Sequence, residues 1–214
     1  MGKARYLLID FDGPICNIFA GLPAPQVAAS LRTMLEDQGI SLPESIHQID
    51  DPLEIFRYSA TLGDDLNRKT LQALTDLEVE ATATSLATPG TLDLLHQARV
   101  QGKPVAVVSN NSNAAVMAYL DRHELTGMFA YVSARMSPDP SLMKPSSHLL
   151  SQALTHLEAD PALSLLVGDS LTDIEASHAA GVVAVGYANR PGKAERLAAS
   201  GADLIIDSMA ELVL

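Results

Sequence analysis

The hydrophobic positions of the chain form short continuous runs, separated by segments in which apolar residues recur every three or four positions. A run without alternation indicates a strand covered on both faces, as in a parallel sheet. Helical spacing places Leu149, Leu150 and Ala153 on one side of the segment 148–156. Strands and helices that alternate in this way predict an α/β fold. The predicted strands are Tyr6–Ile9, Val105–Val108, Ala130–Ser133, Leu163–Val167, Val182–Val185 and Leu204–Ile206.

The connection between the first and second predicted strands is unusually long. It holds about 95 residues, whereas a crossover in such a fold needs only about 10–12. Helical spacing recurs inside it, over 24–38, over 52–62 and over 64–77. We therefore predict a small helical bundle at residues 17–87, inserted into an α/β core formed by residues 1–16 and 88–214.

Acidic residues follow two of the predicted strands. Asp10 and Asp12 come after the first strand, and Asp169 and Asp173 come after the fourth. Residues two apart at a strand end point to the same side, and carboxylates held so close repel one another unless a cation or a shared proton offsets their charge. Acids at strand ends are also common because loops are hydrated, and Asp169 or Ser170 could simply cap a helix. That alternative accounts for one acid and leaves the other unexplained.

Ser109, Asn110 and Lys144 are candidates for the same site. Ser109 and Asn110 follow the second strand, where a hydroxyl and the backbone N–H groups at a helix start can bind an anion. Taken singly, an ordinary Asn-Asn turn and an exposed lysine are the better interpretations. In a parallel sheet, however, ligands bind at the carboxyl ends of the strands, where the strand order reverses. For Ser109 and Asp169 both to reach Asp10, the sheet must be doubly wound and Rossmann-like, with strand order 3-2-1-4-5-6.

Clustered carboxylates at this point call for a divalent cation. Oxygen ligands that include one or two carboxylates, completed by a substrate phosphate, are typical of Mg²⁺ sites. A hydroxyl and a lysine would complete a cradle for the phosphate.

These motifs resemble those of the haloacid dehalogenase superfamily of phosphohydrolases. The matching segments, in the family's order, are Asp10-Phe-Asp-Gly, Ser109-Asn110, Lys144-Pro145 and Gly168-Asp169-Ser-Leu-Thr-Asp173. The resemblance implies that Asp10 is a nucleophile that forms an aspartyl phosphate and that Asp12 is the general acid and base. It further implies that the phosphoryl group is held by Ser109, Asn110 and Lys144, and the helical insertion at residues 17–87 resembles the helical cap of that family. The implied Mg²⁺ ligands are Asp10, Asp12 (through its backbone carbonyl), Asp169 and Asp173.

The resemblance is nearest to phosphoglycolate-phosphatase-like members and implies a Mg²⁺-dependent phosphatase that hydrolyses a small-molecule phosphomonoester. The presence of Asp12 favours phosphoryl transfer over dehalogenation. One alternative is a phosphosugar mutase of the same superfamily, although the segment 15–21 lacks the histidine usual in that branch. Another is a non-catalytic phosphate-sensing module, against which the paired Asp10 and Asp12 argue.

Composition limits the partners. The 214 residues include 14 basic and 26 acidic ones, for a net charge of −12, which argues against binding to nucleic acid or to an anionic membrane. Cys16 is the only cysteine, and the N-terminal residues do not resemble a signal peptide, so we expect a cytoplasmic protein. The expected partner is a small phosphorylated metabolite, which the sequence does not name.

Arg57 is the residue of the predicted cap best suited to binding a distal anion of the substrate. From the sequence alone, an exposed position on a helix face is the interpretation we favour for it. The scattered histidines lack the spacing of a metal site.

Overall fold

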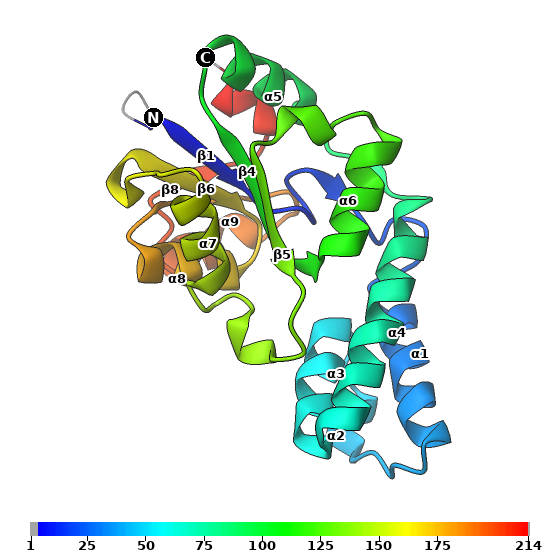
Figure 1. Cartoon of the computed structure of the whole chain (residues 1–214). Helices are drawn as coiled ribbons and strands as arrows, with labels where there is room; N and C mark the ends of the chain where they lie inside the picture. Colours follow the sequence, from blue (N-terminus) through cyan, green and yellow to red (C-terminus); the bar gives the residue numbers. More distant parts are fainter. Residues whose placement is uncertain (1–3, 214) are drawn as a thin grey trace.

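A six-stranded parallel sheet with helices on both faces forms the larger part of the molecule (Figure 1), seen in a computed structural model that describes residues 4–213. Its strands are β1 (Tyr6–Ile9), β4 (Val105–Ser112), β5 (Tyr131–Arg135), β6 (Ser164–Gly168), β7 (Val183–Tyr187) and β8 (Leu204–Ile206). They lie in the order β5-β4-β1-β6-β7-β8. Numbered along the chain, this is the predicted order 3-2-1-4-5-6, so the α/β fold and its doubly wound sheet are confirmed.

Successive residues of the central strand β1 face opposite layers of helices. Leu7 and Ile9 pack in the cluster that includes α5 (Thr91–Val100) and α6 (Asn113–Arg122). Leu8 packs in the cluster on the other face, with α7 (His148–His156) and α8 (Leu171–Ala180). Because both layers are apolar, the strand is hydrophobic at every position, which is why its sequence does not alternate. Beyond β7, α9 (Lys193–Ala199) packs on the edge of the sheet.

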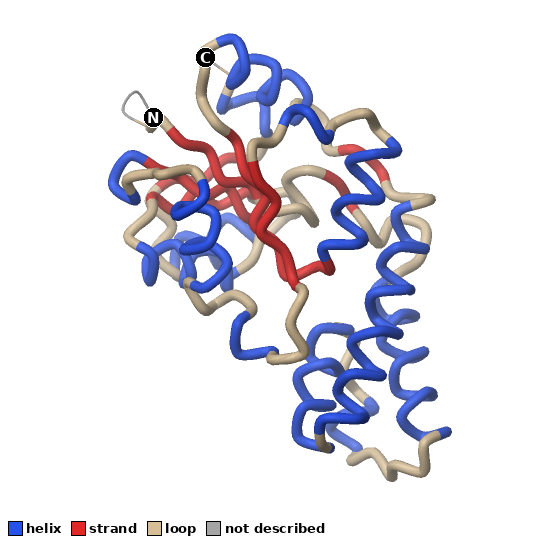
Figure 2. The backbone as a smooth tube through the Cα atoms, in the orientation of Figure 1, coloured by secondary structure: helices blue, strands red, loops and turns tan. Residues whose placement is uncertain are grey.

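Four α-helices lie between β1 and α5 in the sequence and form the lower part of the molecule in Figure 2, where no strands are drawn. They are α1 (Ala24–Asp37), α2 (Glu44–His47), α3 (Pro52–Ser59) and α4 (Asp64–Thr82). Their apolar faces meet in a separate cluster built around Leu31, Phe56 and Leu74, all fully buried. Asp51 caps α3 by accepting a hydrogen bond from the Leu53 N–H at 2.8 Å.

A short antiparallel ribbon joins the helical part to the sheet. It pairs β2 (Cys16–Asn17) with β3 (Leu86–Ala87), so the chain leaves and returns at neighbouring points. The division into a core of residues 1–16 and 88–214 and a cap of residues 17–87 stays a prediction. Among the described residues, no helix combines the length and the apolar character that a membrane crossing requires.

Candidate active site

The sequence-predicted residues gather at the carboxyl edge of the sheet, around a cavity of about 520 Å³ between the sheet and α3. Asp10 and Asp12 follow β1, Asp169 follows β6, and Lys144 arrives from the loop before α7. Ser109 and Asn110 also line this cavity, whereas Asp173 lies behind Lys144, outside the cavity lining. The strand order explains this arrangement, because β1 lies between β4 and β6 and their ends therefore meet.

Lys144 lies at the centre of the cluster and is only 2% exposed. Its Nζ is 2.8 Å from Asp10 Oδ1 and 2.5 Å from Asp173 Oδ1, and it donates to the Val108 carbonyl at 3.1 Å. Burial alone would lower the pKa of Lys144, but the carboxylates of Asp10 and Asp173 outweigh it and hold the pKa above its usual range. The interpretation of Lys144 as an exposed surface lysine is therefore wrong.

Asp10 and Asp173 both contact Lys144. Its Oδ1 accepts a hydrogen bond from the Phe11 N–H at 2.8 Å as well as contacting Lys144. Burial raises the pKa of Asp10 to about 8, assisted by the negative charge of Asp173 and opposed by Lys144. One ammonium cannot neutralise two buried carboxylates, so the cluster carries an excess negative charge that a cation or a proton would stabilise.

Asp12 lies in the turn that follows β1. Its Oδ1 accepts a hydrogen bond from the Ile18 N–H at 3.1 Å, which fixes the side chain. Burial, together with the charge of Asp169, raises the pKa of Asp12 to about 7, which suits a group that must give and take a proton near neutral pH. The next residue, Gly13, has φ of 101°, and a Cβ there would lie 2.5 Å from Asp169 Cγ. Only glycine lets this turn approach Asp169 so closely.

Asp173 contacts both the start of α8 and Lys144. Ser170 is the N-cap of α8 and forms a capping box with Asp173: its Oγ accepts the Asp173 N–H at 3.2 Å, and its N–H donates to Asp173 Oδ2 at 3.0 Å. The Ser170 Oγ also donates to Oδ2 at 2.6 Å. The other oxygen, Oδ1, contacts Lys144. Asp173 therefore caps the helix and at the same time holds the lysine in place.

The segment after Val108 differs from the prediction. Instead of ending there, β4 continues to Ser112, and α6 begins at Asn113 with Ser112 as its N-cap. The helix start is thus four residues beyond Ser109, and the expectation that Ser109 lies directly at a helix N-terminus is wrong. The pairing of β4 with β5 shifts register between Ser109 and Ser112, and this irregularity turns the segment toward the cavity.

Asn110 fixes the backbone of Lys144. Its Oδ1 accepts from the Lys144 N–H at 2.7 Å, and its Nδ2 donates to the Lys144 carbonyl at 3.1 Å. Ser109 Oγ lies 3.2 Å from Asn111 Oδ1 in the same buried segment. The two segments that would hold a phosphate are therefore tied to each other before any ligand binds.

Three carboxylates are placed to hold a metal ion. Asp10, Asp169 and Asp173 each offer an oxygen within 4.8 Å of the others, and carboxylate oxygens are the ligands that Mg²⁺ prefers. The donor set therefore fits Mg²⁺. Because both oxygens of Asp173 already accept hydrogen bonds, Asp10 and Asp169 are the more available ligands.

Two residues near Asp169 escaped the sequence analysis. Asn189 Nδ2 donates to Asp169 Oδ2 at 3.0 Å, and Lys193 forms an ion pair with the same oxygen. Asn189 follows the end of β7 by two residues, so the strand-end rule that identified Asp10 could have identified it as well. Lys193 lies on α9, and its sequence context carries no comparable signal.

Arg57 is half-buried and lines the cavity. Its Nη1 and Nη2 donate to the carbonyls of Pro140 and Lys144 at 3.3 and 2.9 Å, and its Nε lies 3.1 Å from Glu54 Oε1. The exposed position that we favoured from the sequence is therefore wrong, because Arg57 links α3 to the loop that carries Lys144.

Comparison with known proteins places these residues in context. The haloacid dehalogenase-like hydrolase family matches residues 7–187. The chain belongs to this family. Over 220 residues it is 24% identical to a phosphoglycolate phosphatase of Pseudomonas putida, a match that covers 98% of the chain and 78% of the relative. A plasmid-encoded phosphoglycolate phosphatase of Cupriavidus necator is 36% identical over 129 residues, covering 58% of this chain and 53% of that one.

Solved structures of haloacid dehalogenase-like proteins share the fold. A crystal structure of such a hydrolase from Bacteroides fragilis superposes with a TM-score of 0.74 at 23% identity, covering 98% of this chain and all of the other. CbbY from Rhodobacter sphaeroides, solved in complex with phosphate, superposes with a TM-score of 0.70 at 20% identity. The resemblance to the haloacid dehalogenase superfamily is thus confirmed. So is the prediction of an enzyme of the phosphoric monoester hydrolase class, to which the curated relatives belong.

Proposed function

We propose that this haloacid dehalogenase-like protein is a Mg²⁺-dependent phosphatase that hydrolyses small phosphomonoesters through a phosphoaspartate on Asp10. The observation that carries the proposal is the position of Lys144, whose Nζ contacts Asp10 inside a cavity that Asp12 also lines. A phosphoryl group placed there would meet a nucleophile, a proton donor and a fixed positive charge together.

Each side chain has a separate task in the proposed reaction. A carboxylate oxygen of Asp10 attacks phosphorus, the bond to the alcohol oxygen breaks, and Asp12 donates a proton to that oxygen. A water molecule then gives a proton to Asp12 and attacks the same phosphorus, which releases Asp10 and inorganic phosphate. Ser109, Asn110 and Lys144 hold the phosphoryl group, with Asn110 acting through the backbone of Lys144.

Asp10 and Asp169 would be direct Mg²⁺ ligands, together with the backbone carbonyl of Asp12, and Asp173 would support the site through Lys144. When bound, Mg²⁺ supplies positive charge that offsets the phosphoryl oxygens and the clustered carboxylates. We propose that residues 17–87 act as a cap, because α3 closes one side of the cavity and would admit only small substrates. A cavity of about 520 Å³ lies in the usual range for small-molecule sites.

Hydrolysis of p-nitrophenyl phosphate tests the proposal. We expect turnover in millimolar Mg²⁺, loss of turnover in EDTA, and none with Asp10→Asn, because an amide is a poor nucleophile. Asp37→Asn, which alters an exposed carboxylate of α1, should retain normal activity. Turnover by Asp10→Asn, or a phosphate found covalently on another residue, would contradict the assignment. Phosphate binding by the wild type without any turnover would favour a sensing module instead.

A further inference from the structure

The cavity has two chemically different halves. The sheet supplies Asp10, Asp12, Asp169, Lys144 and the segment 109–111. The helical part supplies the opposite wall, whose charged residues are Asp50, Asp51, Glu54 and Arg57. If the phosphoryl group occupies the first half, the rest of the substrate must extend toward the second. The charge of that second wall therefore determines which distal groups are accepted.

Arg57 is the one cation of the helical wall, and its nitrogens already have partners. Two of them donate to the carbonyls of Pro140 and Lys144, and the third contacts Glu54. These contacts use three of the five N–H groups of the guanidinium, and the carboxylate of Glu54 offsets its positive charge. Arg57 therefore contributes little net positive charge to the helical wall.

The start of α3 does not offer an anion site either. Asp51 accepts the Leu53 N–H, and Glu54 lies in the same first turn, so their negative charges offset the positive end of the helix dipole. Asp50 makes no hydrogen bond or ion pair with any other described residue, and its carboxylate is exposed at the cavity wall. The helical wall therefore carries the carboxylates of Asp50, Asp51 and Glu54 and a single guanidinium, which already contacts Glu54.

We propose that this wall selects phosphomonoesters whose distal group is not anionic, and that it favours a distal cation such as an ammonium most. The inference rests on the proposed function, because it assumes that the phosphoryl end is held at Asp10. Like charges in a partly enclosed cavity repel one another, whereas Asp50 would attract a cation without any partner to displace. This specificity differs from that of phosphoglycolate phosphatases, whose named substrate ends in a carboxylate.

Three nearly isosteric substrates test the proposal, since they differ only in the distal group. They are 2-aminoethyl phosphate, 2-hydroxyethyl phosphate and phosphoglycolate. We expect kcat/KM to fall in that order, with about a tenfold difference between the ends of the series, equivalent to about 1.4 kcal/mol. The difference should shrink in about 0.5 M salt, because salt screens exposed charges. Equal values, or a preference for phosphoglycolate, would overturn the proposal.

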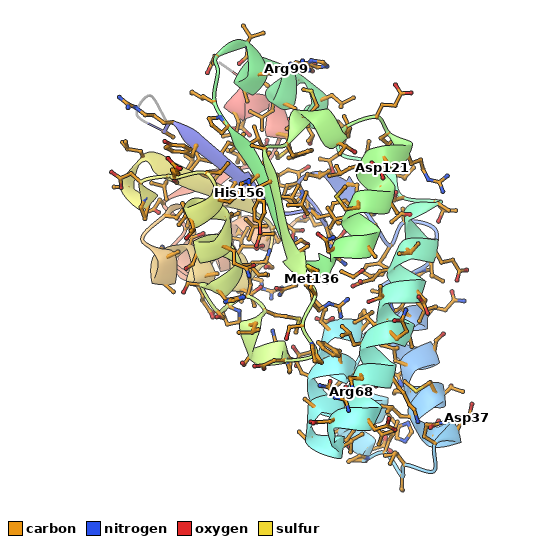
Figure 3. All side chains as sticks on the ribbon, viewed as in Figure 1. Asp37, Arg68, Arg99, Asp121, Met136 and His156 are labelled. Atoms are coloured by element: carbon orange, nitrogen blue, oxygen red, sulfur yellow. The ribbon has the colours of Figure 1, made fainter. Side chains whose placement is uncertain are left out.

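Asp50→Asn is the decisive variant, because Asp50 is exposed and takes no part in the proposed chemistry. It should narrow the preference for 2-aminoethyl phosphate over phosphoglycolate by about threefold. Asp37→Asn is the matched control, since it removes the same charge from the far end of the helical part (Figure 3) and should leave the preference unchanged. A preference unaltered by Asp50→Asn would remove Asp50 from substrate selection.

Binding separates this proposal from the proposed function. Asp10→Asn should bind the three compounds without hydrolysing them, so isothermal titration can rank their affinities independently of turnover. The same order of affinities would support the charge selection even if the wild type did not hydrolyse p-nitrophenyl phosphate. Turnover of p-nitrophenyl phosphate combined with tightest binding of phosphoglycolate would retain the phosphatase and overturn the selection.

Discussion

Glu78 of α4 and Arg135 of β5 form an ion pair inside the protein, with both side chains 1% exposed and 2.6 Å between Oε2 and Nη2. Glu78 also accepts hydrogen bonds from the Asn111 side chain at 3.2 Å and from the Ser112 N–H at 2.8 Å. The guanidinium of Arg135 lies over the ring of Phe56, 5.1 Å from its centroid. This pair therefore joins α4, through Glu78, and α3, through Phe56, to the segment that follows Ser109.

Breaking the pair should strongly destabilise the protein. Arg135→Met leaves Glu78 buried without a compensating charge, and we expect the free energy of unfolding to fall by about 3–5 kcal/mol. Because Arg135 Nε and Nη1 have no hydrogen-bond partner in the described chain, the double variant Glu78→Gln with Arg135→Met should recover much of that loss.

Urea denaturation gives these free energies, and a surface pair on the same helix supplies the control. Lys69 contacts Asp65 at 2.9 Å in an exposed pair on α4, so Lys69→Met should cost at most about 0.5 kcal/mol. A stability of Arg135→Met equal to that of the wild type would show that the buried pair contributes nothing.

Asp12→Asn should separate the two steps of the proposed reaction. The nitrophenolate leaving group scarcely needs a proton, so Asp10 should still be phosphorylated, whereas attack by water should slow by about 10²–10⁴-fold. Rapid mixing with p-nitrophenyl phosphate should then give a stoichiometric burst of nitrophenol and a matching increase in protein mass. Normal steady-state turnover by Asp12→Asn would exclude Asp12 from the mechanism.

Metal binding should stabilise the folded state. The carboxylates of Asp10, Asp169 and Asp173 lie together, with Lys144 between two of them, so Mg²⁺ should raise the melting temperature relative to EDTA. Asp169→Asn should remove most of that increase. Identical melting of the wild type in EDTA and in millimolar Mg²⁺ would contradict the proposed metal site.

The raised pKa of Asp12, about 7, predicts a pH-dependent stability of the metal-free protein. The folded state keeps a proton that the unfolded chain releases above its ordinary pKa of 3.8, so this stabilisation is complete below that pKa and is lost as the pH rises through about 7. In EDTA, Asp12→Asn should therefore melt higher than the wild type at pH 8, and this difference should be smaller at pH 5. A difference in melting temperature that is the same at pH 8 and pH 5 would contradict the raised pKa of Asp12. Asp37→Asn serves as the control.

Arg57→Ala should impair all substrates alike. Arg57 holds the carbonyls of Pro140 and Lys144, so its loss should displace the lysine and lower kcat/KM by roughly ten- to a hundredfold for aryl and alkyl phosphates. The exposed Arg68 of α4 offers a control, and Arg68→Ala should leave kcat/KM unchanged for both aryl and alkyl phosphates. A loss confined to substrates with a distal anion would instead show that Arg57 contacts the substrate.

The order of the sheet could be predicted because two local signals agree. Apolar runs without alternation identified strands covered on both faces, and the polar residues that follow Ile9, Val108 and Val167 had to meet if they formed one site. These residues also carried the family resemblance. An apolar run and the polar residue that follows it are adjacent in the chain, so both can be recognised in a single sequence.

The partners of these residues were decided by the tertiary structure. Arg57 donates to Lys144, 87 residues away, and Arg135 to Glu78, 57 residues away. Charged side chains are usually solvated, so the sequence favoured an exposed position for Arg57, and for Lys144 as well until the family motifs assigned it to the site. Lys144 is buried and Arg57 half-buried because the helical part packs against the loop before α7, where backbone carbonyls and carboxylates replace the water that a charged group requires. These polar contacts join segments that are far apart in the sequence, so a local sequence pattern cannot predict them.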